Sequence, residues 1–382
     1  VYMALLMVPA GAIWFGGASL VAAGANLLAV PLVGLWVVPL ALLGVLLTLL
    51  ELGGAALLWQ WAAWPVEQLL HISATGGDWT YLWLTPRFTA LCLAGVAVGL
   101  SVVQTTVWFR ALACLLMMPL LLSPQPGERQ LEVIVLDVGQ GTAVVVLGAD
   151  RTLLYDTGGG DPAGASLADS VVLPFLRAQG IGRLDEVVIS HGDHDHAAGL
   201  EAVLNALPVE RLWQGGAGHL HPDAEGCRAG RAWRWPDGTR FRFLSPAGRD
   251  GLSSNDASCV LLVENGAGRV LLAGDIGQQQ EYELMRYWRG ALAAQVLLVG
   301  HHGSNSSTSQ AWLNRLRPGL AVLNNAYGNR FGHPHPAVMA RLDASGSADW
   351  EVWRSGAVRI TFDNQGAAHA VAWRGTSESW WK

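Results

Sequence analysis

Apolar side chains run almost without interruption through the first 123 residues, whereas the rest of the chain alternates short apolar runs with polar turns. Residues 1–50 contain no Asp, Glu, Lys or Arg. Because a membrane-spanning helix needs about 20 mostly apolar residues, the pattern predicts a multi-pass α-helical membrane segment. We expect its spanning helices at 3–23, 27–50, 88–106 and 109–123.

The stretch 52–72 is less uniform, because it carries Glu67 and the tryptophans Trp59, Trp61 and Trp64. Tryptophan is enriched where membrane meets water, which favours an interfacial or re-entrant helix here. A buried core helix of a soluble protein is the alternative for these apolar stretches. That alternative does not explain why the chain opens with 50 uncharged residues.

The composition changes at Ser123, since only five charged residues precede it. The segment 124–130 contains proline and glycine and is predicted to be a linker between a membrane domain at 1–123 and a soluble domain at 131–382. The soluble part is long enough for one large α/β domain. The chain begins at Val1 without a basic leader, so we expect the tail of a longer membrane domain rather than a signal peptide.

The soluble part contains short apolar runs separated by polar turns. They predict strands at 131–136, 143–147, 152–155, 186–190, 240–244, 258–264, 269–273, 295–299 and 320–324. Helical patterns occur at 170–179, 278–288, 309–316 and 336–343. Strands come in hairpin pairs early and late, with crossover helices between them, which is typical of two packed sheets with helices outside.

The densest group of polar side chains follows the strand at 186–190. His191, Asp193, His194, Asp195 and His196 lie within six residues, where a buried strand ends and a helix begins. Such turns form the edge of a sheet at which α/β proteins place their chemistry. Histidine and carboxylate together suit a divalent ion that activates water, whereas a solvated polar loop is the alternative.

Three further clusters also follow predicted strands. Asp275 comes after the strand at 269–273, and His301 and His302 come after the strand at 295–299. His333 follows the strand at 320–324 by a short loop. One such cluster would be unremarkable, but several at strand ends are best explained if they converge on one site.

Charge and cysteine content change this picture little. The net charge of −6 gives no overall basic surface, so contact with nucleic acid would need a local patch, and an ordinary solvated hairpin explains the arginines equally well. That patch comprises Arg228, Arg231, Arg234, Arg240 and Arg242. In the soluble part only Cys227 and Cys259 are available to pair, and their spacing matches no zinc motif.

The soluble domain resembles the metallo-β-lactamase superfamily, in the pattern formed by His191, Asp193, Asp195 and His196 and completed by Asp275 and His301. More narrowly, nearly the whole chain is similar to ComEC-type competence proteins. The motifs that carry this similarity are Leu136-Asp137-Val138-Gly139-Gln140-Gly141, Asp156-Thr157-Gly158, the 190–196 turn, Gly274-Asp275, His301-His302-Gly303-Ser304, Gly332-His333-Pro334-His335-Pro336 and, in the membrane part, 25–32.

The resemblance implies an αββα sandwich of four layers and a DNA-uptake channel of natural transformation in the bacterial inner membrane. The membrane domain would pass one strand of DNA inward, and the hydrolase domain would act as a nuclease on the other strand. Implied partners are DNA, membrane lipid and other competence-machinery proteins, and a homo-oligomer is left open. The family's large amino-terminal channel portion is not in this sequence, so the chain alone is not expected to transport DNA. Hydrolysis of another ester, or a catalytically idle DNA-binding domain, are the alternatives.

Two departures from the family pattern affect the site. Thr142 stands where the family often has an aspartate after Gly-Gln-Gly. The superfamily's histidine about 20 residues before the bridging aspartate is replaced here by 255–258, which contain none. His219 and His221 are remote candidates on a loop. The first metal position is therefore expected to lack one nitrogen ligand.

Two divalent ions would share Asp275 as a bridge. His191 and Asp193 would hold one ion, and Asp195, His196 and His301 the other. Asp195 is alternatively a proton shuttle. An aspartate in place of a nitrogen ligand favours manganese or magnesium over zinc, so the expected metals are manganese or zinc, with magnesium as a further option.

The remaining polar residues are expected around the ions. His302 and His333 would touch substrate or support the ligands, and Asp137 and Asp156 would orient ligands. Successive strand residues point to opposite faces, so only one of His301 and His302 should face the metals, and His301 fits the superfamily pattern. Arg110 between the last two predicted spans favours an extracytoplasmic hydrolase domain, although Arg87 argues the other way.

Overall fold

The computed structural model describes residues 8–12, 17–19, 22–75, 81–83, 88–103, 107–121, 131–160, 166–216, 220–247, 251–363 and 365–376. The predicted linker 124–130 and His219 lie outside these ranges. The chain divides into two compact units, of which the second comprises Pro126–Arg177 and Ile181–Lys382.

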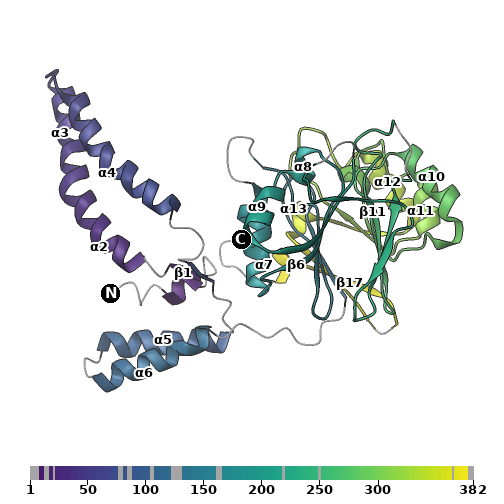
Figure 1. Cartoon of the computed structure of the whole chain (residues 1–382), viewed down its shortest axis with the longest axis horizontal. Coiled ribbons are helices and arrows are strands. Elements are labelled where there is room, and N and C mark those ends of the chain that lie inside the picture. Colours follow the sequence, from purple (N-terminus) through teal and green to yellow (C-terminus); the bar gives the residue numbers. More distant parts are fainter. Residues whose placement is uncertain are drawn as a thin grey trace. The chain divides into compact units, whose positions relative to one another are not determined.

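The first unit contains two helical hairpins. A continuous helix is made of α2 (Ala22–Leu32), the π-helical η1 (Val33–Val37) and α3 (Val38–Leu49), and it packs against α4 (Ala55–Thr75). Figure 1 shows α3 and α4 side by side. Gly44 permits this approach, because a Cβ there would lie 2.4 Å from Trp59 Nε1, which donates a hydrogen bond to Ala41 O. The second hairpin joins α5 (Phe88–Val103) and α6 (Val107–Met117).

One helix among the described residues, Ala25–Leu49, is long and apolar enough to cross a membrane by length and composition. It coincides with the span predicted at 27–50. α5 and α6 fall in the spans predicted at 88–106 and 109–123 but are shorter than a span requires. The prediction of one continuous helix at 3–23 is wrong: residues 8–12 are helical, but strand β1 (Gly17–Ser19) follows and pairs with β2 (Tyr81–Trp83).

The second unit is a sandwich of two sheets. The eight-stranded sheet runs in the order β17 (Ala368–Ala372), β16 (Val358–Phe362), β3 (Glu132–Val135), β4 (Val144–Leu147), β5 (Thr152–Tyr155), β6 (Leu184–Ile189), β7 (Val209–Gln214), β8 (Glu225–Gly226). The seven-stranded sheet runs β15 (Ala348–Glu351), β14 (Leu320–Leu323), β13 (Val296–Leu298), β12 (Arg269–Leu272), β11 (Val260–Glu264), β10 (Arg240–Ser245), β9 (Ala232–Arg234).

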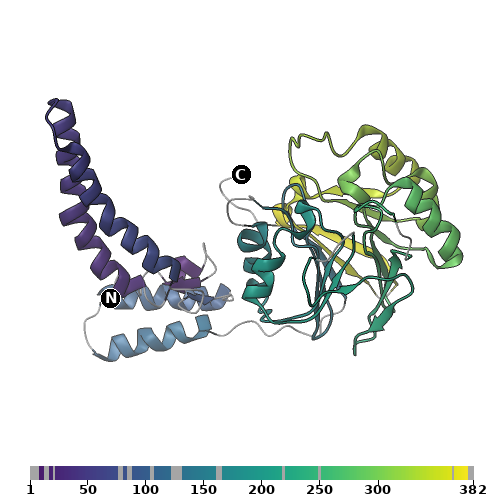
Figure 2. The same cartoon turned by 45° about the horizontal axis from the view of Figure 1, so that its top comes forward.

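Helices cover the outer face of each sheet, which gives the four predicted layers. η4 (Ala168–Val172), α7 (Leu173–Ala178) and α9 (Leu200–Ala206) cover the eight-stranded sheet. α10 (Gln278–Trp288), α11 (Gln310–Leu316) and α12 (Pro336–Ser345) cover the seven-stranded sheet. Figure 1 shows these two groups on opposite sides of the strands, and Figure 2 shows the same order from another direction.

Alternation along the strands builds the layers. Val133 and Val135 of β3 point into the core between the sheets, whereas Ile134 points toward the helices. Strands β5, β6 and β7 are mutually parallel, and so are β12, β13, β14 and β15. The carboxyl ends of parallel neighbours lie at one sheet edge, where polar side chains from different strands can meet.

One carboxyl group is buried between the sheets. Glu186 of β6 accepts a hydrogen bond of 2.9 Å from Trp235 Nε1, and burial raises the pKa of Glu186 to about 7. The folded state therefore keeps a proton that the unfolded state has already released above about pH 4.5.

This buried carboxyl group makes stability depend on pH. Because the folded state binds more protons between about pH 4.5 and pH 7, the free energy of unfolding should fall as the pH rises through this range, by at most about 3 kcal/mol. Glu186→Gln should remove most of this decline, as measured by thermal unfolding at pH 5.5 and pH 8. Glu201→Gln, on the exposed face of α9, removes the same charge and should leave the decline unchanged. Equal pH dependence in the wild type and Glu186→Gln would contradict the expectation.

Candidate metal centre

Polar side chains at the ends of five parallel strands meet at one edge of the sandwich. Asp156 follows β5, and the His191–His196 segment follows β6 and leads into α8 (His194–Ala197). From the other sheet, Asp275 follows β12, His301 and His302 lie in η6 (Gly300–Gly303) after β13, and Asn324 follows β14.

His196 is buried and held from behind. Its Nδ1 lies 2.8 Å from Asp156 Oδ2, and the carboxylate can only accept, so Nδ1 carries the proton. Asp156 is itself fixed by hydrogen bonds from the backbone N–H and the hydroxyl of Ser190. This arrangement turns the Nε2 of His196 toward the centre of the cluster, and it gives Asp156 the orienting position expected from the sequence.

The Nε2 of His196 faces three other side chains. It lies 3.4 Å from Asp275 Oδ1, 3.3 Å from His302 Nε2 and 4.0 Å from Asp195 Oδ1. His302 is only 2% exposed, and its Nε2 lies 3.2 Å from Asp195 Oδ2 and 3.6 Å from Asp275 Oδ2. Its Nδ1 donates to Asn324 O over 2.9 Å, so its Nε2 also points inward.

His191 contributes the other buried imidazole. Its Nδ1 lies 3.0 Å from Ser190 Oγ, while its Nε2 is buried without a hydrogen-bond partner, 3.6 Å from Asp193 Oδ2. Two sets of donor atoms within 4.8 Å of one another result: His191, His196 and Asp275 in one, and Asp195, His196 and His302 in the other.

His301 lies at the margin of this cluster, contrary to the order expected for the two neighbouring histidines. Its Nε2 is 3.8 Å from Asp275 Oδ2, but its side chain is about a third exposed and its Nδ1 faces Ser306 Oγ. Both His301 and His302 have left-handed backbone angles, with φ of 51° and 53°. Strand alternation therefore does not apply after β13, and the deeper position falls to His302.

The remaining predicted residues surround the cluster. Asp193 is half exposed and accepts a hydrogen bond from Ser254. His333 is partly buried, with its ring 6.0 Å from that of His301 and its Nδ1 buried without a hydrogen-bond partner. Asp137 pairs with Arg374 at 2.7 Å. His221 pairs with Asp223 and is not part of either set.

Charge compensation within the cluster shifts several pKa values. Burial opposes ionisation of Asp275 and Asp195, but the neighbouring histidines lower the pKa of Asp275 well below its ordinary value and that of Asp195 to about 2. Burial likewise opposes a charge on His196 and His302, yet the carboxylates raise both pKa values. Burial lowers the pKa of His191. Since a protonated nitrogen cannot bind a metal, protons and metal ions would compete here.

The turn before β4 supports the 193–196 segment. Thr142 N–H donates to Asp195 O over 3.1 Å, and a Cβ at Gly141 would lie 2.6 Å from the same oxygen. Gly141 also has a φ of 150°, so a side chain there would displace Asp195. Thr142 is buried and bonds to Asn324 Nδ2, which gives this departure from the family pattern a structural role beneath the cluster.

The segment 255–258 contributes a hydroxyl group where the superfamily has a histidine. Ser258 Oγ lies 3.5 Å from His191 Nδ1 and accepts a hydrogen bond from Asp275 N–H. Sequence reasoning assigned no role at the site to Ser190, Ser258 or Asn324, because single serine and asparagine residues have no metal-site pattern.

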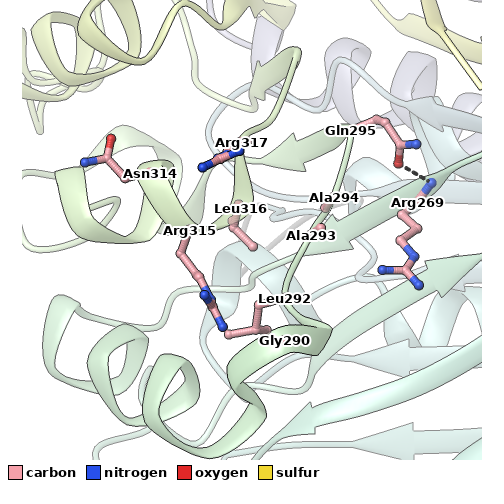
Figure 3. A pocket seen from close by; sticks show the side chains of 10 residues that line it. All are labelled: Arg269, Gly290, Leu292, Ala293, Ala294, Gln295, Asn314, Arg315, Leu316 and Arg317. Carbon is pink, nitrogen blue, oxygen red and sulfur yellow. Dashed lines mark hydrogen bonds between the residues drawn. The ribbon is translucent and has the colours of Figure 1, made fainter.

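Three arginines of the suspected patch, Arg234, Arg240 and Arg242, line one pocket on β9 and β10 together with Glu264. Arg231 pairs with Glu225 and covers the Trp213 ring, whereas Arg242 lies over Trp288. A separate pocket of about 580 Å³ lies at the opposite ends of the strands, before β12, β13 and β14 (Figure 3). Arg269, Arg315 and Arg317 line it, and it contains none of the clustered histidines or carboxylates.

Comparison with known proteins agrees with this arrangement. Residues 136–323 match the metallo-beta-lactamase superfamily, and residues 1–110 match the competence protein family. The chain is 39% identical to Competence protein ComA of Neisseria gonorrhoeae over 219 residues. This aligned region covers 57% of this chain and 30% of that protein. Recombination protein 2 of Haemophilus influenzae is 32% identical over 94% of this chain and 49% of its own length. ComE operon protein 3 of Bacillus subtilis is 28% identical over 92% of this chain and 50% of its own length. The chain thus spans half or less of each relative.

Proposed function

We propose that this chain, which joins a competence-protein domain to a metallo-beta-lactamase domain as in the ComEC family, serves DNA uptake at the bacterial inner membrane. Its hydrolase unit is a metal-dependent nuclease that cleaves the strand that is not transported. The observation that carries this proposal is the convergence of Asp195, His196, Asp275 and His302 at one edge of the sandwich.

The side chains fit divalent ions. The Nδ1 atoms of His196 and His302 donate to Asp156 and Asn324, which leaves both Nε2 lone pairs facing the carboxylates. The buried Nε2 of His191 has no hydrogen-bond partner, and such an atom is costly unless it binds something.

We assign the ligands to two ions. Asp195, His196 and His302 would hold one ion, and His191 and Asp193 would hold the other. Asp275 would serve both, because it shares one set of donor atoms with His191, while its Oδ2 lies 3.6 Å from the Nε2 of His302 in the other set. His301 moves from the ligand set to the substrate side. The mixture of nitrogen and carboxylate donors suits manganese or zinc, with magnesium as a further option.

When bound, such ions activate water and offset the charge that develops on phosphorus. Asp195 is a third exposed and can accept a proton from the attacking water. His301 is about a third exposed beside Asp275, and the ring of His333 lies 6.0 Å from it, so both are proposed to donate hydrogen bonds to a phosphate oxygen or to the leaving group. His302, expected from the sequence to touch substrate, is too buried for that role.

The first unit is proposed to cross the membrane several times, as residues 1–123 of a larger channel domain. α2 and η1 expose Leu27, Leu28 and Leu35 to their surroundings, which supports contact with lipid tails. DNA and other competence-machinery proteins are the proposed partners, and self-association is left open.

The hydrolase unit is proposed to lie outside the cytoplasm. Cys227 and Cys259 form a disulfide, and disulfides persist in oxidising compartments. Chains denatured directly from cells should therefore expose two thiols to a maleimide, those of Cys92 and Cys114, and four after reduction. Four reactive thiols before reduction would instead indicate a reducing, cytoplasmic location.

The experiment that tests the proposed function is cleavage of circular single-stranded DNA by the purified full chain with manganese, with an EDTA control. Nicking that depends on manganese is expected. Binding of DNA without any cleavage would favour an idle DNA-binding domain. Cleavage of a lactone or another small ester, with intact DNA, would favour a different hydrolase.

A further inference from the structure

Two aromatic rings project into solvent from the loop between β14 and α12. Tyr327 is 79% exposed and Phe331 is 53% exposed. Single exposed aromatic residues are common on protein surfaces and need no explanation. Here, however, both rings belong to one loop, and that loop also carries His333 of the candidate metal centre.

The loop is held in place by hydrogen bonds rather than left free. Asn329 Oδ1 accepts from the N–H groups of Phe331 and His333, and Asn329 Nδ2 donates to Ala326 O. Asn325 Nδ2 bonds to Glu351 at 3.3 Å. The backbone therefore presents both rings in a fixed position, which lowers the entropy lost when a ligand stacks on them.

A series of contacts leads from these rings to the metal cluster. The Phe331 ring stacks on the His333 imidazole, with centroids 5.7 Å apart and planes inclined by 24°. The His333 ring is 6.0 Å from the His301 ring, and His301 Nε2 is 3.8 Å from Asp275 Oδ2. A ligand stacked on Phe331 would thus lie a few side chains from the reacting centre.

Arginine accompanies both rings. The guanidinium carbon of Arg330 lies 4.9 Å from the centre of the Phe331 ring. Tyr327 contacts Trp353 at 5.0 Å, and the guanidinium carbon of Arg354 lies 4.8 Å from the Trp353 ring. Flat aromatic faces beside positive charge match a chain of flat bases joined by phosphates.

We propose that Tyr327 and Phe331 form a stacking platform for unpaired bases of a single-stranded nucleic acid, and that Arg330 and Arg354 face its phosphates. The inference rests on the proposed phosphodiesterase function and adds a reason for choosing single strands. Bases in a duplex are stacked on one another, so their faces are not available to the two rings.

Binding to the full chain in EDTA tests the platform without requiring cleavage. The probes are a fluorescent single-stranded DNA oligonucleotide and an abasic oligonucleotide with the same number of phosphates. The double variant Tyr327→Ala with Phe331→Ala should raise the Kd for the first probe by about 5-fold to 150-fold, which is the usual effect of losing a base stack. The Kd for the abasic probe should stay within about twofold. Tyr282→Ala removes another half-exposed ring, on α10, and should change neither Kd.

The result separates the platform from the proposed function. An unchanged Kd for the base-containing probe, or equal weakening with both probes, would overturn the platform. Cleavage of the abasic oligonucleotide by the wild type with manganese reports on the metal centre without base stacking. Its absence would count against the nuclease, whereas the binding comparison in EDTA decides the platform.

Discussion

Replacing Asp275 with asparagine is expected to lower manganese-dependent cleavage of DNA by about a thousandfold or more. Asp275 groups with His191 in one set of donor atoms and lies 3.6 Å from His302 of the other, so asparagine would remove the charge shared by both proposed ions. Loss of several kcal/mol of transition-state stabilisation corresponds to a rate change of this size. Initial cleavage rates of the purified full chain measure the effect.

The matched control is Asp223→Asn. Asp223 is exposed and pairs with His221, and neither residue belongs to the two sets of donor atoms. This variant should retain full activity. Asparagine also preserves the shape of the side chain and the hydrogen bond from the Asp275 N–H to Ser258, so Asp275→Asn should still fold. A cleavage rate within tenfold of the wild type would remove Asp275 from the reaction.

Removing His302 should weaken manganese binding by more than about a hundredfold, whereas removing His301 should weaken it by less than about tenfold. The reason is position: His302 is buried between Asp195 and Asp275, and His301 is partly exposed beside Ser306. Loss of a residue that is hydrogen-bonded to a ligand typically costs about 10-fold to 100-fold, and loss of a ligand costs more. His301 is 3.8 Å from Asp275, beyond hydrogen-bond distance, so its loss should cost less. Elemental analysis after dialysis against limiting manganese compares His302→Ala with His301→Ala.

The catalytic rate of His301→Ala gives the complementary expectation. His301→Ala should keep its metal and lose catalytic rate, because His301 is proposed to contact the phosphate. Thermal unfolding in EDTA checks that both variants fold. If His301→Ala lost its metal and His302→Ala kept it, His301 would be the ligand, as the sequence pattern favours, and the assignment of His302 would be wrong.

The sequence predicted the central strands well, because strands buried on both faces are short continuous apolar runs. β5, for example, spans Thr152–Tyr155 as expected, and α10 spans Gln278–Trp288 as expected. β7 was missed because its first half, with Glu210 and Arg211, is polar and exposed. β16 and β17 were missed because partly exposed residues interrupt their apolar pattern.

The candidate site could likewise be predicted only in part. Clusters of histidine and aspartate after buried strands identified the sheet edge at which they meet. The order of His301 and His302 could not be predicted, because it depends on two left-handed backbone positions that an apolar pattern does not reveal. Support from Asn324 was equally hidden, since the contact uses a backbone carbonyl that every residue possesses.

The most direct test of the proposed centre is the position of the metal. Crystals of the full chain grown with manganese should give two peaks of anomalous scattering at the cluster, one beside Asp195, His196 and His302 and one beside His191 and Asp193, with Asp275 between them. Absence of both peaks, or manganese bound only at another place such as His221, would contradict the metal-dependent nuclease.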